Sequence, residues 1–511
     1  MDPLAYLALA PNMNHILARL MPEGGMWLLV CFALSALGLW FAQRRYCLLT
    51  RFRDEKLSPL NLGIARAAVF AGLVLMVGHE ELLAFGRLDD SLILPPFGWK
   101  WIAPHLPRSA TFLELVYALL VISGFLAVIG LWTRISTLVA SLLGFYVLTI
   151  PQLFGQVVHY NHLVLFAFLL AVSPCRDAFS VDAWLRRRRL GTTAELPQTS
   201  MYYAAPLKIM MLVMGIAYYF AGVWKLCRVG LRWFTPDYMR LILLIKMQEF
   251  DPTSVQRWAL NHPLILTLGA IFTVVFEVGF VFAILDRRTR ILALIAGIAF
   301  HNFTYMLMEI QFLDMQACFV ILVDWAALIA VLRPKVKQDS ASRISNAAPV
   351  RTHPRLTASF RVLAYVTTIG MFIGGATHIV NGWPIGCYPT FDWQPDSLVK
   401  ELGFELRSTD GNTYKDSLDF DRSMAKPYSS ERWKSLVGEV TREDIPYCER
   451  RAKALLRLWA TANHRSNLES ATLYLDVYDF DRSTTIPVQH RLIGTIPMRS
   501  IGADAEHCAL Q

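Results

Sequence analysis

The chain has 511 residues, of which 55% are hydrophobic and only 17% are charged, well below the roughly 25% charged residues of soluble globular proteins. This composition excludes a soluble globular protein and predicts a chain that is mostly solvated by lipid. The net charge is +9, but Lys and Arg occur in a few short tracts rather than over one broad surface, so no nucleic-acid partner is expected.

Ten apolar runs predict transmembrane helices, each of which needs about 20 mainly apolar residues. The runs are Met26 to Ala42, Ile64 to Leu83, Leu113 to Trp132, Ile135 to Ile150, His162 to Pro174, Leu207 to Leu226, Leu264 to Leu285, Ile291 to Met308, Ala317 to Leu332 and Val362 to Ile379. The fourth and fifth runs are short, so tilted or partly re-entrant elements are alternatives there. The predicted fold class is an all-α polytopic membrane bundle of about ten transmembrane helices.

The basic residues of the loops predict the orientation of these helices, because cytoplasmic loops carry an excess of Lys and Arg. The basic tracts fall in every second loop. They are Arg44, Arg45, Arg51, Arg53 and Lys56; Arg134; Arg176 with Arg186 to Arg189; Arg287, Arg288 and Arg290; and Arg333, Lys335, Lys337, Arg343, Arg351, Arg355 and Arg361. We expect these loops to be cytoplasmic and, with ten spans, both termini to lie outside the cytoplasm.

The last 130 residues or so lack long apolar runs and have the common size of one domain. Alternation of apolar and polar residues predicts strands at 471–480 and 486–496, and helices are expected at 430–437 and 449–462. The tail is therefore predicted to be an extracytoplasmic α+β domain. The expected division is an N-terminal segment with the first transmembrane helix (1–62), a transmembrane domain (63–333), a cytoplasmic linker (334–361), the last transmembrane helix (362–381) and the soluble domain (382–511).

Ionisable residues inside apolar runs are candidate functional groups, because they are costly to place in a membrane. His162 and Lys225 lie at the expected outer ends of the fifth and sixth helices, and His301 lies in the outer half of the eighth. Their similar depth suggests one cavity that opens outward. Glu277 lies nearer the middle of the seventh helix.

Each of these groups also has a structural interpretation. Lys225 could extend its ammonium group to the membrane interface, or its aromatic and apolar setting could free the amine as a base. His162 and His301 could each form a hydrogen bond between helices, and Glu277 could accept one from a neighbouring backbone or Arg. The eight cysteines have no spacing typical of a metal or haem site, so no metal is predicted.

Three segments carry a resemblance to a known family. They are Tyr160-Asn161-His162, leading through Ser173-Pro174 to Ser180-Val181-Asp182; Ala221-Gly222-Val223-Trp224-Lys225-Leu226, followed by Trp233; and Ala299-Phe300-His301, continuing to Gln311-Phe312. In order and spacing, from about Gly63 to Leu332, the chain resembles the vitamin K-dependent gamma-carboxylase-like family, often called the HTTM domain. The segment around Lys225 is the most specific of the three.

The resemblance implies an oxygen-dependent membrane carboxylase that uses reduced vitamin K, of the menaquinol type, as its cofactor. In that family a lysine deprotonates the quinol on the non-cytoplasmic side. The oxygenated quinone then removes a glutamate gamma-proton, and carbon dioxide captures the carbanion. The implied partners are the lipid bilayer, a quinol and a peptide or protein substrate, and the expected location is the inner (plasma) membrane of a bacterium.

The resemblance also implies roles for individual residues. Lys225 falls on the catalytic lysine, His162 on the histidine that supports the intermediate, and His301 on a further family histidine. Trp224 stands where the animal enzymes have a second lysine, and those enzymes have a larger non-membrane region than this tail. Two alternatives to a carboxylase therefore remain open: a non-catalytic maturation or interaction factor of the same fold, and a secondary transporter.

Overall fold

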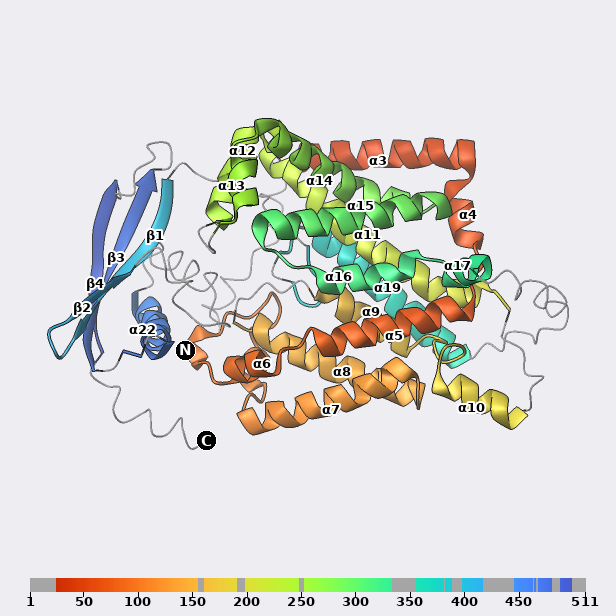
Figure 1. Cartoon of the computed structure of the whole chain (residues 1–511), viewed down its shortest axis with the longest axis horizontal. Helices are drawn as coiled ribbons and strands as arrows, with labels where there is room; N and C mark the ends of the chain where they lie inside the picture. Colours follow the sequence, from red (N-terminus) through yellow and green to blue (C-terminus); the bar gives the residue numbers. More distant parts are fainter. Residues whose placement is uncertain are drawn as a thin grey trace.

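The computed structural model shows a bundle of long helices with a small β-sheet at one end (Figure 1). Statements on the structure concern residues 24–154, 160–190, 198–247, 252–332, 354–380, 382–387, 398–416, 445–462, 464–465, 467–479 and 488–498. The longer helices run side by side along the bundle (Figure 1). Many of their outward apolar residues are exposed, and clusters of buried apolar residues fill the interior.

The apolar helices agree in position with the ten predicted runs. They are α3 (Gly24–Tyr46), α5 (Pro59–Leu75), α6 (His79–Gly86), α7 (Ala110–Ile129), α8 (Thr133–Gln152), α9 (Asn161–Ala171), α11 (Met201–Val229), α14 (Pro263–Ala283), α15 (Arg287–Met308), α16 (Leu313–Cys318), α17 (Trp325–Leu332) and α19 (Pro354–Ala376). Among the described residues, seven helices are long and apolar enough to cross a membrane, or up to nine if each of two bent pairs is one span. The eleven residues of α9 form a shorter apolar helix.

Two of the predicted runs are not single straight helices. The run from Ile64 to Leu83 is divided between α5 and α6, whose axes differ by 53°. Gly78 precedes α6, and Glu80 and Glu81 lie in the first turn of α6, where acidic residues favour a new helix start. The other run is divided before α17 by a bend of 72°. The Asp324 carboxylate there accepts a hydrogen bond from the Ala327 N–H (3.1 Å), an arrangement that starts a helix.

The basic loops and the C-terminal sheet lie at opposite ends of the bundle (Figure 1). Helix α4 (Leu48–Asp54), the arginine-rich helix α10 (Val181–Leu190) and the start of α15 lie together at one end. The ion pair between Arg290 and Glu55 (2.6 Å) connects α15 to the segment after α4 at this end. Basic residues are therefore concentrated at one end of the bundle, and the β-sheet lies at the other end.

The C-terminal region contains an antiparallel sheet and one helix. The strands β1 (Leu398–Ser408), β2 (Thr413–Asp416), β3 (Leu468–Asp479) and β4 (Gln489–Pro497) are arranged in the order β2-β1-β3-β4. The two predicted strands correspond to β3 and β4, and the predicted helix at 449–462 to α22 (Ile445–Ala462). The predicted helix at 430–437 lies outside the described residues.

Helix α22 covers one face of the sheet. Its apolar residues Leu455 and Trp459 are buried against β1, where the rings of Trp459 and Phe404 meet edge to face with centroids 5.2 Å apart. On the side of the bundle, Arg451 Nε donates a hydrogen bond to the Ser91 carbonyl (3.2 Å) in the loop after α6. Helix α22 is thus in contact with the end of the bundle that lies opposite the basic loops.

The segment that follows α19 inserts a tryptophan into the same end of the bundle. Trp383 is buried, and its indole Nε1 donates a hydrogen bond to Thr149 Oγ1 of α8 (2.8 Å). Its carbonyl accepts a hydrogen bond from Trp99 Nε1 (2.9 Å), and its ring stacks on Phe145. The junction between the membrane helices and the tail is therefore packed into the bundle.

Candidate functional site

Helices α11 and α14 approach each other closely because Ala221 and Gly222 have small side chains. A Cβ atom at Gly222 would lie 2.8 Å from Val278 Cγ2 and 2.9 Å from Glu277 Cβ, distances that a real side chain could not occupy without moving α14. Small residues at a helix crossing are the usual means of close backbone approach in membranes. This contact sets the position of the two ionisable groups beside it.

Lys225 and Glu277 form a buried ion pair across that crossing. Lys225 Nζ lies 2.7 Å from each of the two carboxylate oxygens of Glu277, and it also donates to the Ala221 carbonyl (3.4 Å). The lysine is 1% exposed and the glutamate 2%. The structure therefore differs from the interface-anchoring interpretation of Lys225: the ammonium group points into the protein and has a carboxylate partner.

His301 reaches the same region from α15. Its Nε2 and the Tyr218 hydroxyl, which comes from α11, share a hydrogen bond of 2.5 Å. The imidazole ring is 2% exposed and lies against Phe312, with ring centroids 4.8 Å apart. An imidazole and a phenol in contact provide a path on which one proton can move.

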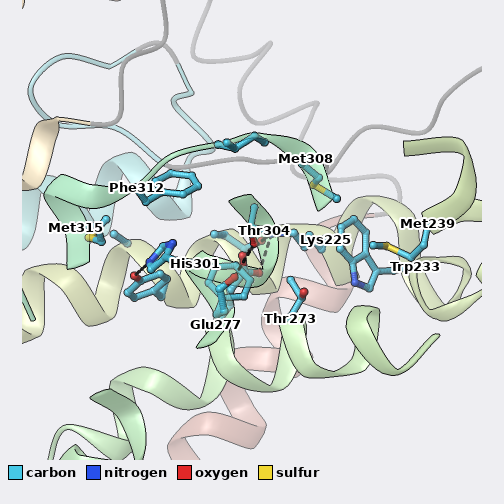
Figure 2. A pocket seen from close by; sticks show the side chains of 15 residues that line it. Lys225, Trp233, Met239, Thr273, Glu277, His301, Thr304, Met308, Phe312 and Met315 are labelled. Atoms are coloured by element: carbon cyan, nitrogen blue, oxygen red, sulfur yellow. Dashed lines mark hydrogen bonds and ion pairs between the residues drawn. The ribbon is translucent and has the colours of Figure 1, made fainter. Parts of the chain in front are cut away.

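Lys225, Glu277, Tyr218 and His301 all line one cavity between α11, α14, α15 and the chain after α15. Figure 2 shows Lys225 and Glu277 near its centre, with His301, Phe312 and Met315 on one side and Trp233 and Met239 on the other. The free space is about 70 Å³, enough for a few water molecules but far below the roughly 300 Å³ of the smaller ligand pockets. A ring-sized ligand would require the lining side chains to move.

Three methionines, Met239, Met308 and Met315, are among the residues that line this cavity. The unbranched thioether side chain has several accessible rotamers and adapts to different neighbours at little cost. These three methionines can therefore change rotamer and enlarge the cavity for a ligand. Beside them, the Lys225 ammonium lies 5.3 Å from the centroid of the Trp233 ring, within range of a cation–π contact.

His162 lies outside the lining of this cavity. It is buried at the start of α9, with its Nε2 3.3 Å from Asp314 Oδ2 of α16. Asp314 directly precedes Met315, which does line the cavity. The structure therefore brings Lys225 and His301 to one cavity and places His162 against the other side of the segment that borders it.

Three residues of the site were not assigned functional roles from the sequence. Glu277 was interpreted as a structural acceptor for a backbone group or an Arg, whereas its partner is Lys225. Tyr218 and Asp314 were not predicted to take part in the site. Spacing gives a signal for one of them: Tyr218 precedes Lys225 by seven residues, two helical turns, so both lie on one face of α11. Among the described residues, no group of three or more His, Cys, Asp or Glu could hold a metal ion.

The family comparison covers the part of the chain that forms this cavity. The HTTM domain matches residues 55–325, slightly more than half of the chain, and this range includes Lys225, Glu277 and His301. The chain belongs to the HTTM family. This is the domain of vitamin K-dependent gamma-carboxylase-like proteins. No curated protein and no solved structure matches the chain.

The limits of the HTTM domain divide the structure unequally. The domain covers the helices from α5 to α16 and the four ionisable residues that line the central cavity. Helix α3 precedes it, and α19 and the sheet follow it. This HTTM protein therefore has its buried ion pair within the family domain, whereas α22 and the sheet lie outside that domain.

Proposed function

We propose that this HTTM protein is a quinol- and oxygen-dependent membrane carboxylase whose site is the cavity around Lys225. The observation that carries the proposal is the convergence of a lysine, a carboxylate, a histidine and a tyrosine in an apolar, buried cavity. Clusters of ionisable groups in such surroundings are typical of catalytic sites. The lipid-facing helices around the cavity suit a substrate that is itself soluble in lipid.

Within this proposal, Lys225 is the base for a quinol hydroxyl. The amine becomes available when one proton passes from its ammonium group to the Glu277 carboxylate, across the 2.7 Å contact. Such an internal transfer needs no water in the cavity. His301 and Tyr218 then hold the opposite side of a bound ring and donate a hydrogen bond to an oxygen that gains charge.

A reduced naphthoquinone bound in this place would supply, with oxygen, the strong base that removes a glutamate gamma-proton before carbon dioxide adds to the carbanion. The ring would be held between the apolar residues that line the cavity, and the methionines among them would move to admit it. His162 would act from outside the lining, through Asp314 and the segment that carries Phe312 and Met315.

The direct test is product formation by the purified protein in lipid nanodiscs. With reduced menaquinone, oxygen, bicarbonate and a Glu-containing peptide, we expect mass spectrometry to detect a gain of one carboxyl group per modified glutamate. The gain should require both the quinol and oxygen. If quinol is oxidised without carboxylation, the substrate assignment is wrong; if neither reaction occurs with any peptide, the carboxylase proposal is overturned.

One observation favours a second candidate, a non-catalytic maturation or interaction factor. The cavity holds about 70 Å³, and the lysine is already bound through both oxygens of one carboxylate, which is what a purely structural ion pair would show. In that case, α22 and the sheet would bind the partner protein. Absence of quinol oxidation, together with binding of a partner protein that is lost when α22 and the sheet are deleted, would support this candidate.

The proposed orientation places the cavity and the sheet on the outer side and the arginine-rich α10 in the cytoplasm. We expect a membrane-impermeant maleimide applied to intact cells to label Asp410→Cys, an exposed position after β1, and not Arg187→Cys in α10. Cys47 is exposed at the basic end and should stay unlabelled as an internal control. The reverse pattern would place the site on the cytoplasmic face.

A further inference from the structure

A second cavity lies at the basic end of the bundle, far from the site around Lys225. It is formed where the turn between α7 and α8 meets the segment before α10 and α10 itself, and its volume is about 640 Å³. Four arginines line it: Arg134, Arg176, Arg186 and Arg189. A cavity of this size can hold a charged group larger than a water molecule or a small ion.

Within the residues that the structure describes, acidic groups balance the positive charge of this cavity only in part. Asp182, which also lines it, is engaged with the start of α8: its carboxylate accepts hydrogen bonds from the backbone N–H groups of Trp132 (3.0 Å) and Thr133 (2.8 Å). Asp177 lies 3.4 Å from Arg186 and accepts a hydrogen bond from the Tyr203 hydroxyl. Each acidic group is thus already used in holding the local structure.

Two of the four arginines have no carboxylate partner among the described residues. Arg134 and Arg189 form no ion pair within that part of the chain, and both are exposed toward solvent. Burial, and then the like charges of Arg134 and Arg186, lower the pKa of Arg176. The arginines therefore repel one another, and an anion between them would remove that repulsion.

The cavity continues into exposed apolar surface. Trp132 and Ile135, which line it, are 67% and 68% exposed. Trp132 directly precedes α8 and Ile135 lies in its first turn, and α8 is long and apolar enough to cross a membrane. Tryptophan at such a position is typical of the headgroup region of a bilayer. An occupant with a charged end and apolar chains would meet both parts of this surface.

We propose that this basic cavity, formed by Arg134, Arg176, Arg186 and Arg189, binds the phosphate group of an anionic phospholipid, whose acyl chains lie along α8 beside Trp132 and Ile135. The guanidinium groups form charge-assisted hydrogen bonds with phosphate oxygens. Basic pockets between membrane helices are a known way of holding anionic headgroups. This binding is independent of the reaction proposed for the cavity around Lys225.

The test compares two double variants that remove the same charge. Arg134→Gln/Arg189→Gln removes the two lining arginines that have no carboxylate partner within the described part of the chain. Arg187→Gln/Arg188→Gln removes two neighbours that do not line the cavity, one of which stacks on Trp184. Binding of phosphatidylglycerol and of phosphatidylcholine to the detergent-solubilised protein is measured by native mass spectrometry. At about 0.15 M salt, charges more than roughly 8 Å apart are largely screened.

We expect the cavity variant to weaken phosphatidylglycerol binding roughly 30-fold, from about 1 kcal/mol for each lost arginine. The control variant should weaken it much less, because Arg187 and Arg188 do not line the cavity. Phosphatidylcholine binding should be weak in all three proteins. Equal losses in both variants would mean diffuse attraction and would overturn the site. Inorganic phosphate that binds the cavity as tightly as the lipid does would overturn the lipid assignment in favour of a free phosphate ion.

Discussion

Lys225→Met is expected to abolish quinol oxidation by the purified protein and, in the same variant, to lower its stability. Removal of a positioned base typically costs about 10²–10⁴-fold in rate. The methionine also leaves Glu277, which is 2% exposed, without its cation. Breaking a buried pair by removal of one partner costs about 3–5 kcal/mol, so loss of activity in this variant alone has two explanations.

The double variant Lys225→Met/Glu277→Gln separates the two explanations, because it removes both charges and keeps side chains of similar size. We expect its thermal unfolding midpoint to return most of the way to that of the native protein, since replacing a whole buried pair is often neutral. Its quinol oxidation should remain absent. Native-level oxidation in the double variant would show that the amine has only a structural role and would contradict the proposed mechanism.

Trp383→Ala is expected to destabilise the membrane bundle itself, although the residue follows the last transmembrane helix. Truncation of a buried tryptophan costs about 3–5 kcal/mol, and the change also leaves Thr149 without the indole donor and Phe145 without its stacked ring. The measurement is the unfolding midpoint of the detergent-solubilised protein. We expect a clearly lower midpoint, with unfolding still cooperative.

Trp101→Ala provides the matched control for this prediction. Trp101 lies at the same end of the bundle but is 72% exposed, and surface substitutions usually change stability by less than about 0.5 kcal/mol. Equal effects of the two substitutions would mean that the segment after α19 is not part of the folded bundle. Trp383→Phe, which keeps a ring beside Phe145 but not the indole donor, should give an intermediate loss.

The sequence predicted the helices well because hydropathy depends on each residue alone. All ten runs coincide with apolar helices. The bends did not follow from hydropathy, because a break such as the one before α17 depends on a side-chain cap at Asp324. Strand β1 was not predicted, although its buried residues Leu402, Phe404 and Leu406 alternate with Gly403, Glu405 and Arg407.

Two members of the cavity were predicted from the sequence, but Tyr218 and the pairing of Lys225 with Glu277 were not, and His162 lies outside the lining. Lys225 and His301 were recognised as costly groups at similar depth, and both line one cavity. The Lys225–Glu277 pair joins residues 52 positions apart, and it depends on a helix crossing that Gly222 permits. Packing between distant segments decides which helices cross and at which residues. Such packing cannot be read from the residues of a single sequence.

The short contact between Lys225 and Glu277 has an electrical consequence. A proton that moves between them travels at most 2.7 Å, about a tenth of a hydrocarbon core roughly 30 Å thick. Moving one charge across the whole membrane takes electrical work of about 2.3 kcal/mol per 100 mV. The electrical work of this proton transfer is therefore only about 0.2 kcal/mol per 100 mV. Proton exchange at this pair is thus nearly indifferent to the voltage across the membrane, and energised and de-energised vesicles should support it equally.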